Sequence, residues 1–276
     1  MSRQTTFTYH AAIFRSLCML VLCIASGLSV AIAQEKTLAG FGVVLMHGKG
    51  GQPGGYIQPI ASALQSQGAL VVMPKMAWSG TKGRPDSYSV SYATALLEID
   101  RAIALLKSQG ATKIVVAGQS LGANAALGYA VNKGAEISGI VLLAPGHTPE
   151  RVRVPEIASA LANAQQLLRS GKGQEIADYP DFNQGKRFYT RATAEAYVSF
   201  FDPKGPAVMP LNASFIPSLP MLWIIGRRDV LVSAGRGYVF DRAPANKKSQ
   251  YIEIDAEHID TPQSAQAEVI AWLRTL

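Results

Sequence analysis

The chain has 276 residues, of which 48% are hydrophobic and only 16% are charged. This length is sufficient to bury one substantial core, and the apolar runs that recur along the chain exclude global disorder. The formal net charge is +7, but the Lys and Arg residues are scattered, without a basic run or interleaved aromatic residues. The composition therefore argues against a nucleic-acid partner.

The first 33 residues are typical of an export signal. A polar to basic opening precedes an apolar stretch over 16–33, which ends in the small-residue pattern A-x-A at 31–33. These features describe a cleavable secretory signal peptide, with cleavage before Gln34. We therefore expect an exported protein, periplasmic or secreted, without stable membrane insertion after residues 1–33 are removed. The alternative is a retained membrane anchor, because the apolar stretch approaches spanning length.

Both cysteines, Cys18 and Cys23, lie within this segment. The mature chain would then contain none, which excludes disulfides, a thiol nucleophile and a thiolate metal site. Packing alone must hold such a protein together.

From residue 36 onwards, strand and helix patterns alternate. In chain order, the predicted elements are a strand over 41–46, a helix from about 57 to 64, a strand over 69–73, a helix over 92–109, strands over 113–117 and 137–144 with a helix over 121–132 between them, strands over 220–225 and 250–254, and a final helix over 262–276. This order predicts an α/β fold in one domain, residues 34–276, with a mostly parallel sheet of about six strands flanked by helices.

Residues 147–219 interrupt the alternation. This segment has helical pieces but no clear strand, and it holds a group of aromatic residues. Its length and its Pro and Gly content predict a helical cap insertion that lies over the sheet, instead of a second full domain. The aromatic residues are Phe182, Phe188, Tyr189, Tyr197, Phe200 and Phe201.

The motif Gly118-Gln119-Ser120-Leu121-Gly122 fits G-x-S-x-G and lies between a predicted strand and a predicted helix. That context is typical of a nucleophile elbow, in which a sharp turn holds the serine in a strained conformation at the carboxyl edge of the sheet. Glycines flank the turn because larger side chains would crowd it. The amide of Leu121, at the helix N-terminus, can stabilise an oxyanion.

Serine needs a base to take its proton. Of the four histidines, His10 lies in the predicted signal peptide, and His258 follows the last strand in a loop that can reach the sheet edge. We therefore predict His258 as the base. His47 is expected to shape its own loop through hydrogen bonds, and His147 to be a surface or packing residue.

The base needs a carboxylate to fix its tautomer. Asp229 follows the fifth predicted strand, which gives the chain order serine, acid, histidine. Asp255 and Asp260 are alternatives, but they lie so near His258 in sequence that they are poorly placed to hold the far side of its ring.

The segment His47-Gly48-Lys49-Gly50-Gly51 follows the first predicted strand. Its small residues let backbone amides approach a ligand, so we expect a second oxyanion donor here, the amide of Lys49 or else that of Gly48. The segment lacks the ending of a phosphate-binding loop, and the chain has no dinucleotide-binding motif or metal-ligand spacing. We expect no cofactor and no metal.

Together, the His-Gly segment at 47–48, the G-x-S-x-G motif, Asp229 and His258 resemble the α/β-hydrolase superfamily, in particular its carboxylesterase-like and lipase-like members. The resemblance extends from about residue 40 to 276. It implies a sheet that has eight strands in the full form, of which the first two are absent here, and a cap in the place of residues 147–219.

The expected function is hydrolysis of a small-molecule carboxylic ester through an acyl-enzyme intermediate. Gly48, Met76 and Trp78, with the aromatic residues of the cap, are candidates for the substrate pocket. The same three side chains could instead cleave thioesters, lactones or peptides. A non-catalytic binding protein with this fold, or an envelope protein that acts through surface charge, is a further alternative.

Overall fold

The structure, a computed structural model, describes residues 37–276. The predicted signal peptide, with His10, Cys18 and Cys23, lies outside the described residues. Among the helices of residues 37–276, none has the length and apolar character that crossing a membrane would require.

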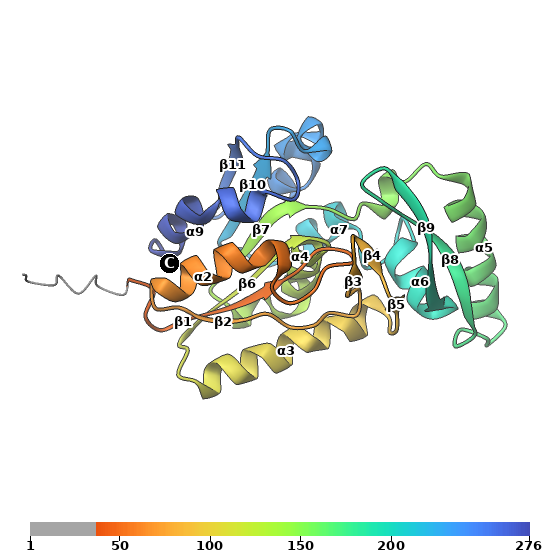
Figure 1. Ribbon diagram of the computed structural model, residues 1–276, viewed down its shortest axis with the longest axis horizontal. Helices are drawn as coiled ribbons and strands as arrows, with labels where there is room; N and C mark the ends of the chain where they lie inside the picture. The colour runs from red at the N-terminus through yellow and green to blue at the C-terminus, as the bar shows by residue number, and fades with distance from the viewer. Residues whose placement is uncertain (1–36) are drawn as a thin grey trace, which may run out of the picture. The chain divides into compact units, whose positions relative to one another are not determined.

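A six-stranded parallel sheet forms the centre of the fold, in the order β11-β10-β7-β6-β1-β2 (Figure 1). Its strands are β1 (Phe41–Met46), β2 (Leu70–Val72), β6 (Lys113–Ser120), β7 (Gly139–Pro145), β10 (Met221–Gly226) and β11 (Gln250–Ile254). The predicted fold class and all six predicted strands are therefore confirmed. Apolar runs identified the four central strands, β1, β6, β7 and β10, because both faces of a parallel sheet are buried there.

Alternate residues along each strand contribute to two separate hydrophobic clusters, one on each face of the sheet. Val43 and Leu45 pack with α2 (Gln58–Ser66) and α9 (Gln266–Leu273), whereas Val44 and Met46 face the cluster that contains side chains of other helices. The helices on this second face are α3 (Tyr92–Ser108), α4 (Leu121–Lys133) and α7 (Met209–Phe215). The sheet is therefore covered on both sides, and the functional side chains can meet only at its edges.

The predicted final helix is interrupted. The chain forms a short helix, α8 (Thr261–Ser264), and then α9, with Ala265 between them. The loop after β2 also contains three two-residue strands, β3 (Gly80–Thr81), β4 (Arg84–Pro85) and β5 (Ser87–Tyr88), which the sequence pattern did not reveal. Runs of two residues are too short to show a period.

The insertion is not purely helical, so this part of the prediction is wrong. Between α5 (Pro155–Arg169) and α6 (Ala194–Phe201), the strands β8 (Ile176–Asn183) and β9 (Lys186–Thr193) form an antiparallel hairpin. Most of β8 is polar or exposed, and it contains Pro180, so the usual strand signal is weak. The hairpin pairs with β5, which joins the cap to the loop after β2.

Candidate active site

Ser120 ends β6 at the point where α4 begins, with φ 57° and ψ −118°. This is a strained conformation for a residue with a side chain. A Cβ atom on Gly118 would lie 2.2 Å from the backbone of Gly122, and one on Gly122 would lie 2.5 Å from the carbonyl oxygen of Met46. The two glycines are therefore required sterically, and the predicted elbow geometry is present.

Two hydrogen bonds in series join three side chains from distant parts of the sequence. Nε2 of His258 lies 2.9 Å from Oγ of Ser120, and Nδ1 of His258 lies 2.6 Å from Oδ2 of Asp229. Ser120 ends β6, and Asp229 and His258 follow β10 and β11. The structure thus brings together the three residues that the sequence singled out.

The side chain of Asp229 is held in place beside His258. It is buried, and its second oxygen accepts a hydrogen bond of 2.8 Å from the amide of Leu231. The alternatives are turned elsewhere: Asp255 pairs with Arg228 at the surface, and Asp260 precedes α8. Neither is bonded to His258 within the described part of the chain.

His47 has the loop-shaping role that was predicted. Its Nε2 accepts a hydrogen bond from the amide of Met76 at 3.3 Å, so Nδ1 carries the proton and donates to the carbonyl oxygen of Gly48 at 2.8 Å. Burial lowers the pKa of His47, which favours this neutral form. The ring therefore fixes the peptide between Gly48 and Lys49.

Backbone hydrogen bonds hold the loop after β1 in place beside the serine. The amides of Gly50 and Gly51 donate to the carbonyl oxygens of Trp78 and Gly48. A Cβ atom on Gly48 would lie 3.0 Å from Cβ of Ser120, so the loop passes directly beside the elbow.

The side chain of Lys49 takes part in a buried network that no sequence pattern predicts. Its ammonium group lies 2.6 Å from Oδ1 of Asp181 on β8 and 5.2 Å from the ring centroid of Phe201. The other oxygen of Asp181 accepts from the hydroxyl of Tyr88 at 2.9 Å. These contacts join the loop beside the serine to both the cap and the short strand β5.

His147 lies beside this network. Nε2 of His147 donates to the carbonyl oxygen of Phe200 at 2.7 Å, and burial lowers the pKa of His147 to about 3, with the charge of Lys49 adding to the effect. The ring is therefore neutral near pH 7. Of its two predicted interpretations, packing is the one that the structure shows, because the ring packs against Phe200 and Phe201. His147 also lines a cavity at Ser120.

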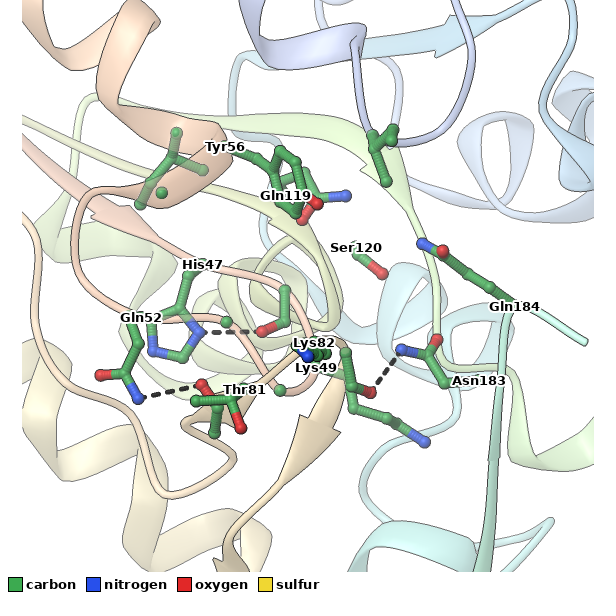
Figure 2. A pocket seen from close by; sticks show the side chains of 18 of the residues that line it. His47, Lys49, Gln52, Tyr56, Thr81, Lys82, Gln119, Ser120, Asn183 and Gln184 are labelled. Carbon is green, nitrogen blue, oxygen red and sulfur yellow. Dashed lines mark hydrogen bonds between the residues drawn. The ribbon is translucent and has the colours of Figure 1, made fainter. Parts of the chain in front are cut away.

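Two cavities meet at Ser120. One, of about 600 Å³, is lined by His258 and by apolar side chains of the cap and of the loop after β10, and the other, of about 580 Å³, by the loop after β1. Figure 2 shows the hydroxyl of Ser120 facing the second cavity, with Gln184 of the β8–β9 turn nearby. Gly48 lines this second cavity, as predicted.

The prediction that Met76 and Trp78 line the substrate pocket is wrong. Both side chains are buried, and neither lines a cavity that reaches Ser120. Trp78 donates from Nε1 to the carbonyl oxygen of His47 and packs against Phe200, so the loop after β2 turns its apolar side chains into the core. Of the cap aromatic residues, Phe182 and Phe201 line the cavity, whereas Tyr197 and Phe200 are core.

Comparison with known families agrees with this geometry. Residues 41–184, more than half of the chain, match the family described as "Serine aminopeptidase, S33". The chain belongs to this family of α/β hydrolases. No curated protein sequence matches the chain.

Solved structures of other α/β hydrolases share the fold. A structure from work on LipS and LipT, two metagenome-derived lipolytic enzymes, has a TM-score of 0.64 and 16% identity, covering 86% of this chain and 95% of that one. The monoacylglycerol lipase of Paleococcus ferrophilus has a TM-score of 0.59 and 21% identity, covering 85% and 94%. A thermostable carboxyl esterase from Bacillus coagulans has a TM-score of 0.59 and 18% identity, covering 85% and 88%.

Within residues 37–276, no group of three or more His, Cys, Asp or Glu side chains is arranged to hold a metal ion. The sequence did not identify Asp181 and Tyr88, or five polar residues of the second cavity, namely Gln52, Lys82, Asn183, Gln184 and Lys186. None belongs to a motif, and each is placed by long-range packing.

Proposed function

We propose that this hydrolase cleaves carboxylic esters, with Ser120 as the nucleophile, His258 as the general base and Asp229 as the residue that orients the histidine. The observation that carries the proposal is the pair of hydrogen bonds in series, 2.9 Å from Ser120 to His258 and 2.6 Å from His258 to Asp229. This arrangement can both activate a serine hydroxyl and stabilise the imidazolium that forms.

In the first half of the reaction, Oγ of Ser120 attacks the ester carbon while its proton moves to Nε2 of His258. The carbonyl oxygen becomes an oxyanion, for which the amides of Leu121 and of Lys49, or else Gly48, are the proposed donors. The C–O bond to the alcohol breaks, and the alcohol leaves with the proton from His258. The acyl group remains on Ser120.

In the second half, a water molecule gives a proton to His258 and attacks the acyl carbon. The bond to Ser120 breaks, the carboxylic acid leaves, and the proton returns to Oγ. Asp229 keeps Nδ1 of His258 protonated throughout, so Nε2 is free to accept.

An ester fits the cavities better than a peptide with a free amino terminus. An aminopeptidase must bind the ammonium group of its substrate, for which a free carboxylate is the usual partner. Among the described residues, the carboxylates that line the two cavities are Asp229 and Glu257, which lie against His258 and Arg228. The three similar structures named above are likewise lipolytic or esterase proteins.

The test is turnover of a short-chain aryl ester and of the matching aryl amide. We expect ester hydrolysis to be lost in Ser120→Ala and unchanged in Ser62→Ala, an exposed serine on α2. A fluorophosphonate probe should label the wild type and Ser62→Ala but not Ser120→Ala. Activity retained in a folded Ser120→Ala protein would remove this residue from the mechanism, and a faster amide reaction would favour peptidase function.

A further inference from the structure

The two cavities at Ser120 differ in the charged side chains that line them. The cavity of about 600 Å³ has apolar walls from the cap and from the loop after β10, provided by Val152, Ile157, Phe182, Phe201, Val230 and Leu231. The cavity of about 580 Å³, which we call the polar cavity, has amide and lysine side chains beside the apolar Tyr56, Ile57 and Ile259. The amide and lysine side chains are those of Gln52, Gln119, Asn183, Gln184, Lys82 and Lys186. A substrate that spans Ser120 would therefore meet the apolar cap side chains, with charges of both signs, on one side and lysines without a lining carboxylate on the other.

The polar cavity carries excess positive charge. Three lysines line it, and none of its lining residues is Asp or Glu. The charge of Lys49 is balanced by Asp181 at 2.6 Å. Lys82 and Lys186 have no carboxylate within 4.0 Å in residues 37–276. Two uncompensated positive charges at one cavity attract an anion.

Tight turns place the backbone of these two exposed lysines at the cavity. Lys82 and Gly83 connect β3 to β4, and Gln184 and Gly185 connect β8 to β9, with positive φ at all four residues. Lys186 begins the strand that follows the second turn.

A side-chain hydrogen bond joins the two turns. Nδ2 of Asn183 donates to the carbonyl oxygen of Gly83 at 2.8 Å, as Figure 2 shows. The first turn also lies against the loop after β1, because a Cβ atom on Gly50 would be 2.2 Å from the amide nitrogen of Arg84. The cationic rim is therefore built on a fixed backbone, which lowers the entropy cost of binding.

We propose that the polar cavity binds an anionic group of the substrate, a carboxylate or a phosphate, so that the preferred ester carries a negative charge on one side of the scissile bond and an apolar group on the other. This inference rests on the proposed ester hydrolysis and names the substrate class of that site. The anionic group can be attached either to the alcohol part or to the acid part of the ester. In both cases it would interact with Lys82 and Lys186 through the same charge attraction.

Two matched pairs of esters distinguish these sources. The first pair is 3-(butanoyloxy)benzoate and 3-(butanoyloxy)benzamide, which differ in the charge of the alcohol part. The second is an aryl monoester of suberic acid and the same ester with a terminal carboxamide, which differ in the charge of the acid part. We expect kcat/KM for the anionic member to exceed that for its neutral partner about 3- to 10-fold in one pair, and this ratio to fall toward 1 in 0.5 M salt.

The double variant Lys82→Gln/Lys186→Gln should reduce the preferred ratio to about 1. The matched control is Lys204→Gln/Lys247→Gln, which removes two exposed charges away from the cavity and should keep the wild-type ratio. Thermal unfolding checks that both proteins fold. Equal rates within both pairs, or a ratio that survives the first double variant, would overturn this inference alone. No hydrolysis of any of the four esters would overturn the proposed function and the inference with it.

Discussion

The ammonium group of Lys49 lies 2.6 Å from Oδ1 of Asp181, and these two side chains are only 5% and 0% exposed. The residues are 132 positions apart in the sequence. One lies in the loop that passes beside Ser120, and the other in the cap hairpin. This buried ion pair therefore connects the loop beside Ser120 to the cap hairpin.

We predict that Asp181→Asn destabilises the protein by about 3–5 kcal/mol, because it leaves the charge of Lys49 buried without a counter-ion. The double variant Lys49→Met/Asp181→Asn removes both charges and should recover a large part of this loss. Urea unfolding of the three proteins measures the effect. If Asp181→Asn unfolded at the wild-type urea concentration, the ion pair would not support the fold.

Asp229→Asn should lower kcat by about 10³- to 10⁴-fold with little change in KM, because an amide can leave His258 in the wrong tautomer. The matched control is Asp255→Asn, which removes the exposed partner of Arg228. Steady-state kinetics on a short-chain ester measures both. Near-normal turnover by Asp229→Asn would show that another group orients the histidine.

The stability of the protein should depend on pH through His147. The pKa of its side chain is about 3 in the folded state and near 6.5 in an unfolded chain. Between these values the unfolded state binds more protons, so stability rises with pH. The contribution is fully present above about pH 6.5 and is lost as the pH falls toward 3.

The variant His147→Gln tests this dependence, since it keeps a donor for the carbonyl oxygen of Phe200 but cannot titrate. We expect the wild type to lose about 2.5 kcal/mol of unfolding free energy relative to the variant between pH 7.5 and pH 4.5. Urea unfolding at the two pH values measures the difference. His47, whose pKa is also lowered, is present in both proteins and cancels. A constant difference would mean that His147 titrates normally in the folded state.

Export remains a prediction from the sequence. We expect the mature protein recovered from the host in which the signal functions to begin at Gln34, because the A-x-A pattern ends at residue 33. Intact-mass measurement and N-terminal sequencing of the processed protein test this. A mature protein that retains residues 16–33 would support the anchor alternative.

The sequence alone identified the six strands of the main sheet and the three side chains that meet at its edge. It could do so because the residue patterns that mark these elements lie within short segments of the chain. Buried parallel strands need continuous apolar runs, and the turn at Ser120 needs a glycine on each side, so both leave a readable pattern. Distance along the chain from His258 was sufficient to prefer Asp229 over Asp255.

The cap and the walls of the cavities were decided only by the tertiary structure. The β8–β9 hairpin is half exposed and polar, so its strands lack the apolar run on which the prediction relied. Whether Trp78 faces the substrate or the core depends on which way its loop folds, and the sequence gives no period for a loop.

Lys49 illustrates both cases, because the role of its backbone could be predicted from the sequence and the partner of its side chain could not. Its position after the first strand made its amide a candidate donor, because backbone geometry follows from local order. The partner of its side chain could not be inferred, since any of the chain's carboxylates could have neutralised it. Folding brings Asp181 to it because the cap hairpin pairs with β5, and that contact depends on packing between segments far apart in the sequence.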